Sequence, residues 1–128
     1  MTDNDIKKKI EIAVLKNSKK TGVMVDAILI FETCENKMSQ INMTLRPLRG
    51  MFGNSFSKSS ICILTGCSDK KYKKKADQRI KECHSNGIAT YFWDQSNSVE
   101  RSYWLGQEWE LLKWIANFSQ PLDITKHL

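Results

Sequence analysis

Two short apolar segments, joined by a helix-like one, constrain the fold of this chain more than any other feature. Residues Val23 to Phe31 are almost all apolar, and Ser60 to Leu64 forms a second such segment. Continuous apolar character over this length is typical of strands that are buried on both faces, as in parallel sheets. Parallel neighbours need a crossover connection, so the pattern predicts a strand, a crossover helix and a second parallel strand.

The crossover helix carries a proline within its own pattern. Ser39 is a suitable N-cap residue for it. Apolar side chains then recur at helical spacing, at Ile41, Leu45, Leu48, Met51 and Phe52. Pro47 lacks an N–H group and clashes with the preceding turn, so we expect either a kink or a helix that starts late.

Helical patterns also flank these two strands. A first helix is expected from about residue 4 to residue 17, capped by Asp3 or Asn4. Lys73 to Ser85 is expected to form another helix, with Asn86-Gly87 as its left-handed stop.

The C-terminal part repeats the alternation. Ile88 to Trp93 is predicted to be a third strand, and Glu100 to Phe118 a closing helix that ends before Pro121. Strands separated by helices favour right-handed crossovers and a parallel sheet. We therefore expect an α/β fold with three layers, in which a parallel three-stranded sheet is flanked by helices.

Composition indicates one domain, which we expect to span residues 1–128. The chain is 41% hydrophobic and 27% charged, as in ordinary globular proteins. No apolar segment approaches the roughly 18 residues that a membrane helix needs, and the first residues lack the apolar core of a secretory signal. The expected location is cytoplasmic.

The cysteines do not have metal-site spacing. Cys34, Cys62, Cys67 and Cys83 include no C-x-x-C pair, and the two histidines are far apart. We expect no metal site, and reduced thiols. Cys62 is predicted to be a core residue, whereas Cys67 lies in a loop and could be exposed.

The order of these segments resembles the second half of an immunity-associated GTPase, the avirulence-induced-gene type of P-loop GTPase. The resemblance runs from about Ile6 to Ile115. It rests on the strand Asp26-Ala27-Ile28-Leu29, a helix ending in Phe52-Gly53, and a strand ending in Thr65-x-x-x-Asp69.

The resemblance implies a place for a guanine base, with GTP or GDP as the ligand. Thr65 and Asp69 stand where the family has its base-reading loop, and the Asp69 carboxylate could pair with two donors of guanine. Trp93 could stack on the base, and Asp94 replaces the family's asparagine. The polar residues after the three strands, Glu32 to Asn36, Thr65 to Asp69 and Trp93 to Asn97, would form one rim of the sheet.

Hydrolysis is not expected, because the phosphate-binding parts are missing. The chain has no Gly-x-x-x-x-Gly-Lys-Ser/Thr and no Asp-x-Pro-Gly. The predicted domain is thus a truncated, GTPase-like one without catalytic residues. Two of the implied site residues also have a plainer interpretation: Asp69 is suited to cap the following helix, and Trp93 to pack as a core aromatic residue.

A cluster of lysines precedes and begins the third predicted helix. Lys70, Lys71, Lys73, Lys74 and Lys75 surround Tyr72 and dominate a formal net charge of +6. Such a cluster can bind nucleic acid or another acidic surface, with Tyr72 stacking on a base. The alternative is a solvated helix start, whose lysines oppose the helix dipole.

The strand from Val25 to Phe31 raises a question of partners. In a complete GTPase sheet the strand that carries the P-loop lies beside it, so its absence would expose an apolar edge. We expect self-association through this edge, coverage by the N-terminal helix, or a partner protein that supplies strands. Three functional hypotheses follow: a guanine-nucleotide site that keeps only its base side, a non-catalytic interaction or regulatory module, and a basic binder.

Overall fold

A parallel three-stranded sheet lies at the centre of the fold. The computed structural model describes residues 2, 4–6, 8–9, 12, 24–67, 70–93 and 101–123, with backbone only for 101–105. The sheet consists of β2 (Ile28–Thr33), β3 (Ser60–Thr65) and β4 (Ala89–Phe92), in the order β2-β3-β4. Both neighbouring pairs are parallel, so the predicted α/β class and sheet are confirmed.

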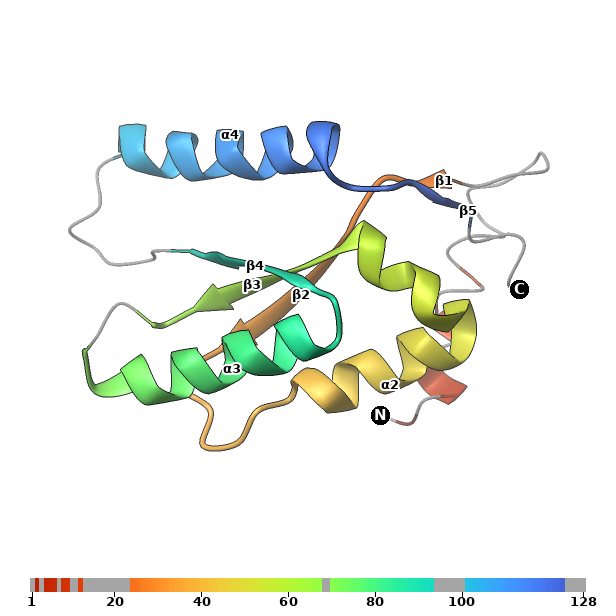
Figure 1. Ribbon diagram of the computed structural model, residues 1–128, viewed down its shortest axis with the longest axis horizontal. Coiled ribbons are helices and arrows are strands. Elements are labelled where there is room, and N and C mark those ends of the chain that lie inside the picture. The colour runs from red at the N-terminus through yellow and green to blue at the C-terminus, as the bar shows by residue number, and fades with distance from the viewer. Residues whose placement is uncertain are drawn as a thin grey trace.

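Helices cover both faces of this sheet. The helix α2 (Ile41–Phe52) continues into the 3₁₀ segment η1 (Gly53–Ser59), and the short 3₁₀ segment η2 (Lys70–Tyr72) leads into α3 (Lys73–Ser85). The last helix is α4 (Arg101–Asn117). Because α2 and α3 lie on one side of the sheet and α4 on the other, the fold has the predicted three layers (Figure 1). No helix in the described part of the chain is long and apolar enough to cross a membrane.

The first predicted strand, Val23 to Phe31, is wrong as a single element. It divides into β1 (Met24–Val25) and β2, which runs on to Thr33. β1 pairs antiparallel with β5 (Leu122–Asp123), away from the parallel sheet. The break falls at Asp26, whose carbonyl oxygen accepts a hydrogen bond from the Ser119 hydroxyl at 2.5 Å. The chain after α4 therefore fixes the point at which β1 ends.

The prediction that both faces of the strand are buried is also wrong for β2, whereas it is confirmed for β3. Leu29 and Phe31 are 40% and 67% exposed, whereas Ile30 and Glu32 are each 4% exposed. In β3 every residue from Ser60 to Leu64 is buried. The difference follows from position, because β3 is the central strand and β2 is an edge strand of the described sheet.

The main core lies between the sheet and the α2 and α3 helices. Ile30, Cys62 and Leu64 come from the sheet, and α2, η1 and α3 contribute the larger part of the remaining side chains. These are Ile41, Leu45, Leu48, Phe52, Phe56 and Cys83. The 3₁₀ segment η1 contributes Phe56, which is 1% exposed, to this core.

The structure refines the predicted helix starts. At the N-terminus Thr2 Oγ1 accepts the Asp5 N–H at 3.2 Å, and the Asp5 carboxylate accepts the Thr2 N–H at 2.9 Å, so Thr2 caps this turn instead of Asn4, while Asp3 lies outside the described residues. The N-cap of α2 is Gln40 instead of Ser39. Ser39 still accepts the Ile41 N–H, at 3.2 Å.

Pro47 lies inside α2, which begins six residues before it. The predicted late start is therefore wrong. α3 has its predicted bounds, and Gly87 follows it with a φ of 72° while its N–H donates to the His84 carbonyl. The predicted left-handed stop is confirmed.

Candidate functional site at the carboxyl edge of the sheet

The ends of the three parallel strands meet at one edge of the sheet. Thr65 lies opposite Thr33, and Leu64 lies opposite Phe92. The Trp93 N–H donates to the Leu64 carbonyl at 2.9 Å, which places Trp93 beside the end of β3. The structure thus brings two predicted site residues, Thr65 and Trp93, to one rim. Asp69 and Asp94 lie outside the described residues.

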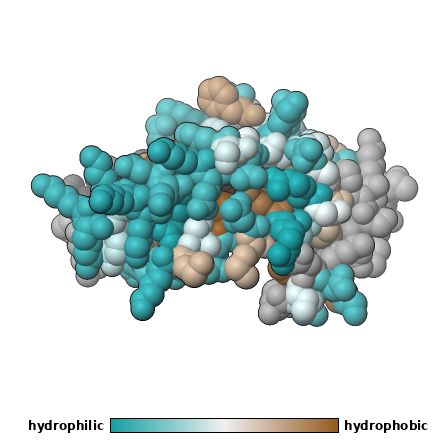
Figure 2. All heavy atoms as spheres, turned by 60° about the horizontal axis from the view of Figure 1, so that its bottom comes forward, coloured by the Kyte–Doolittle hydropathy of each residue, from teal (hydrophilic) through white to brown (hydrophobic). Residues whose placement is uncertain are grey.

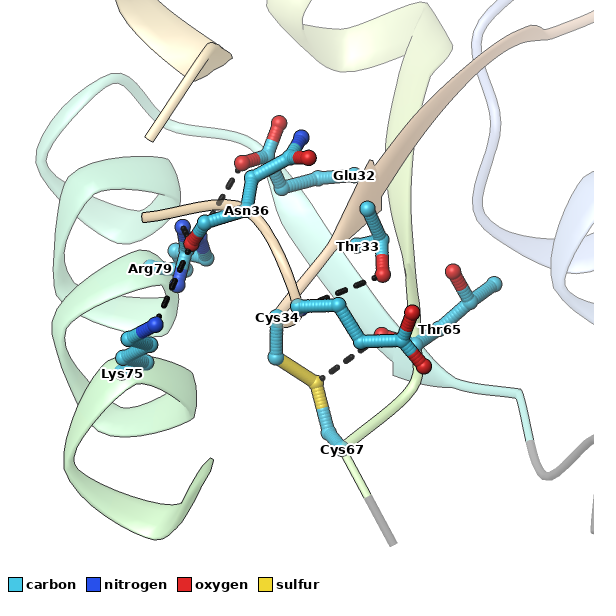
Figure 3. Close-up of a disulfide and its surroundings, with 9 residues drawn as sticks. Glu32, Thr33, Cys34, Asn36, Thr65, Cys67, Lys75 and Arg79 are labelled. Atoms are coloured by element: carbon cyan, nitrogen blue, oxygen red, sulfur yellow. Dashed lines mark hydrogen bonds and ion pairs between the residues drawn. A yellow bond between two sulfur atoms is a disulfide. The ribbon is translucent and has the colours of Figure 1, made fainter. Parts of the chain in front are cut away.

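A disulfide joins the ends of β2 and β3. Cys34 and Cys67 are bonded, with their Cα atoms 5.4 Å apart (Figure 3). The backbone supports this link, because the Cys34 N–H donates to the Thr65 carbonyl at 3.0 Å. The expectation of reduced thiols is wrong for this pair. A strand ladder that places residues 34 and 67 at adjacent strand ends brings their side chains together, and that proximity is not visible from their separation along the chain.

The turn after β3 is tightly packed at Gly66. Gly66 has a φ of 66°, in the left-handed region. A Cβ atom at this position would lie 2.9 Å from the Thr33 Oγ1 and 3.1 Å from the Glu35 side chain. Only glycine therefore fits between the two strand ends, and it lets the chain turn directly into Cys67.

A buried ion pair fixes the loop after β2. Arg79 of α3 donates through Nε to the Glu32 carboxylate at 3.0 Å, and both side chains are at most 3% exposed. The same Glu32 oxygen accepts the Gln40 N–H at 3.1 Å. A second guanidinium nitrogen of Arg79 donates to the Asn36 carbonyl at 2.9 Å (Figure 3). Arg79 thus connects α3 to β2 and to the loop that follows β2.

Lys75 extends this connection towards the lysine cluster. Its Nζ donates to the same Asn36 carbonyl at 3.4 Å. A surface pocket of about 310 Å³ lies alongside, between α3 and the loop that leads into α2. Its lining is mainly polar and consists of Lys37, Met38, Ser39, Asn42, Lys75, Gln78, Arg79 and Glu82. The Ser39 hydroxyl donates to the Glu82 carboxylate at 2.6 Å, so two of the side chains that line this pocket are hydrogen-bonded to each other.

The lysine cluster surrounds one aromatic ring. Lys71 Nζ is 5.0 Å and Lys75 Nζ is 5.6 Å from the centre of the Tyr72 ring, within the range of cation–π contacts. Lys70, Lys73 and Lys74 are exposed. Seen from the side of α2 and α3, hydrophilic residues cover most of the surface (Figure 2). The predicted basic patch is therefore exposed at the start of α3.

Among the described residues, no acidic side chain caps α3. Its N-cap position is Tyr72, whose side chain makes no capping hydrogen bond, and its first turn has no acidic residue. The 3₁₀ segment η2 precedes α3, and Asp69, the predicted cap, lies outside the described residues.

Cys62 and Cys83 form a buried pair of free thiols between β3 and α3. The hydrogen bond with Cys83, together with burial, raises the pKa of the Cys62 thiol. The Cys62 thiol therefore stays protonated, and it donates to Cys83, a hydrogen bond that lowers the pKa of Cys83. Among the described residues, no group of three His, Cys, Asp or Glu side chains could hold a metal ion.

Sequence reasoning missed the Glu32–Arg79 pair and the disulfide. A signal for the pair was present, because Arg79 occupies a helical position in line with Ala76 and Cys83, both of which are buried. A charged residue on the core-facing side of a helix indicates a buried partner. Glu32, one step beyond the apolar part of β2 and in line with Ile30, was the available partner.

Comparison with models of known protein families and with curated proteins finds no match for this chain.

Proposed function

We propose that this protein binds a guanine nucleotide, GTP or GDP, through its base at the carboxyl edge of the sheet, and that it does not hydrolyse it. The observation that supports this proposal is the strand order β2-β3-β4, with the Thr65 turn following the central strand. Ligands of open α/β sheets bind beyond the carboxyl ends of the strands. In the resemblance to immunity-associated GTPases, the base-reading loop follows the strand that corresponds to β3.

Thr65 and Trp93 have distinct roles in this proposal. Trp93 is partly exposed next to the end of β3 and offers a flat face for a base. The Thr65 carbonyl is already hydrogen-bonded to Cys34, so its side-chain hydroxyl is the group offered to a ligand. By the resemblance, Asp69 would accept the two donors of the guanine edge, and Asp94 stands where the family has an asparagine. Lacking a phosphate-binding loop, the chain would hold the base only, and weak binding is expected.

Calorimetric titration of the whole chain with GDP, GTP, ADP and ATP tests this proposal. Guanine nucleotides should bind more tightly than adenine nucleotides, and Asp69→Ala should abolish the difference, because it removes the carboxylate that pairs with guanine. Asp77→Ala is the matched control, since Asp77 is an exposed acidic residue of α3. Absence of binding at millimolar GDP and GTP would rule the proposal out.

A second candidate function, binding of nucleic acid or another polyanion, is favoured by the lysines around Tyr72. Two ammonium groups near one ring, with three further exposed lysines, offer both charge and a stacking surface. Binding of single-stranded RNA should then weaken steeply with salt. Tyr72→Ala should weaken it at every salt concentration without changing the slope, because it removes stacking but no charge. RNA binding that is unaffected by this substitution and by Lys73→Gln with Lys74→Gln would exclude this candidate.

A further inference from the structure

The two cysteines of the Cys34–Cys67 disulfide differ in exposure. Cys34 is 0% exposed, whereas Cys67 is partly exposed at the turn after β3. Thiol–disulfide exchange needs the approach of a thiolate to one sulfur atom. The difference in exposure favours attack at Cys67 over attack at the buried Cys34.

Backbone pairing joins β2 to β3 in addition to the disulfide. Six residue pairs from Ile28↔Ser60 to Thr33↔Thr65 align the two strands, and the Cys34 N–H donates to the Thr65 carbonyl beyond the last pair. The disulfide adds a covalent link at this end of the strands. Reduction would therefore leave the six pairs in place and loosen the turn at Gly66 and Cys67, together with the hydrogen bond between Cys34 and Thr65.

We propose that the Cys34–Cys67 disulfide is a reversible redox modification site, reduced by a dithiol that attacks Cys67, and that it controls how firmly the turn after β3 is held against β2. A thiolate of the dithiol bonds to the Cys67 sulfur, and the bond to Cys34 breaks. The Cys34 sulfur leaves with the electron pair and takes up a proton. The second thiol of the dithiol then attacks its own mixed disulfide and releases Cys67. Two electrons and two protons pass to the protein, and the dithiol becomes a disulfide.

The specificity for a dithiol follows from the position of Cys34. In the mixed disulfide on Cys67, the Cys34 thiol stays next to the bond, because the strand ladder holds it there. It closes the original disulfide again before a second monothiol molecule arrives, since an intramolecular reaction has a high effective concentration. A dithiol avoids this reversal, because its own second thiol is equally close to the mixed disulfide and can break it.

Chemical reduction under native conditions, followed by alkylation and peptide mass mapping, tests the proposal. Dithiothreitol should make Cys67 reactive towards iodoacetamide while the circular dichroism spectrum stays unchanged. Cys34 is 0% exposed, so it should be labelled by a second reagent that is added after denaturation, and only if the disulfide was reduced. Glutathione at the same thiol concentration should leave most of the pair oxidised. Cys62 and Cys83 are internal controls, because they are buried and should not react with iodoacetamide in the native protein in either state. Reduction that occurs only together with unfolding, or that labels all four cysteines at once, would overturn the proposal.

Amide hydrogen exchange provides the second readout. On reduction, the amides of Cys34, Gly66 and Cys67 should exchange about tenfold faster or more, while those of Ile61 to Leu64 should not change. The Cys34→Ser, Cys67→Ser double variant should exchange like the reduced protein and should not respond to dithiothreitol. Equal exchange at Cys34 and Gly66 in oxidised and reduced protein would contradict control of the turn.

The state of the disulfide should also affect the affinity for GDP, a prediction that rests on the proposed function. The oxidised protein should bind GDP more tightly than the reduced protein, because the Thr65 turn is held in place before the ligand arrives. Equal affinities would overturn this consequence. If neither form binds GDP, the proposed function fails, whereas the labelling and exchange results still decide the redox proposal.

Discussion

Gly66 has a backbone conformation that side chains with a Cβ atom rarely adopt. We expect Gly66→Ala to lower the free energy of unfolding by at least about 1–2 kcal/mol, because φ is positive. The close approach of the new methyl group to Thr33 and Glu35 should add to this loss. Gly50→Ala is the matched control: Gly50 lies exposed within α2 with nothing near its Cβ position, and alanine should stabilise the helix by about 0.5–1 kcal/mol. Urea denaturation of both variants measures the difference, and equal stabilities would contradict the packing at Gly66.

Arg79 connects α3 to β2 and to the loop after β2, and its removal would leave a buried charge unpaired. Arg79→Met keeps most of the side-chain volume but leaves the buried Glu32 carboxylate without its partner. The loss of unfolding free energy should be about 3–5 kcal/mol. Adding Glu32→Gln should recover part of it, since the uncompensated charge disappears. Lys81→Met, at an exposed position of the same helix, should change stability little. If Arg79→Met were no more damaging than this control, the ion pair would not contribute to the fold.

Residue-level reasoning from the sequence succeeded where the cause was local. The stop at Gly87 depends on neighbouring backbone only, and it was predicted. The Glu32–Arg79 pair and the Cys34–Cys67 bond join residues that are 47 and 33 positions apart. Their proximity depends on the register of β2 against β3 and on how α3 packs on the sheet, which no local pattern encodes.

At the scale of elements, the sequence predicted which segments would form the main helices and strands, but not that the first strand would divide into two. α3 has its predicted bounds, because its helical pattern, its length and its glycine stop agree. Val23 to Phe31 divides because tertiary contacts from the segment after α4 compete for its first half. β1 and β5, each of two residues, carry too little pattern of their own to be recognised.

The first turn of α3 carries lysine side chains, whose positive charges interact unfavourably with the helix dipole. Lys73→Glu and Lys74→Glu should each raise the free energy of unfolding by about 0.3–1 kcal/mol, because the first turn has no acidic residue. The same changes should weaken RNA binding and reduce its dependence on salt. Lys81→Glu, further along α3, should bring no such gain in stability. Thermal denaturation and filter binding measure the two effects, and a loss of stability in the first two variants would exclude dipole repulsion at this site.

At the scale of the whole molecule, the edge strand β2 exposes apolar side chains. β2 has β3 on one side and no described strand on the other. Leu29 and Phe31 make the outer part of this edge apolar. Unpaired apolar edges favour strand addition. A second copy of the chain, pairing edge to edge about a two-fold axis, would satisfy these groups.

We expect the protein to self-associate through β2. The protein should sediment above its 14.8 kDa chain mass at high concentration, and Phe31→Lys should return it to the monomer, because it places a charge on the edge. Phe92→Lys is the matched control: Phe92 is 51% exposed and lies on the opposite edge strand, β4. Analytical ultracentrifugation distinguishes the two variants. A wild-type protein that sediments as a monomer throughout, or equal effects of the two lysines, would show that β2 is not the associating edge.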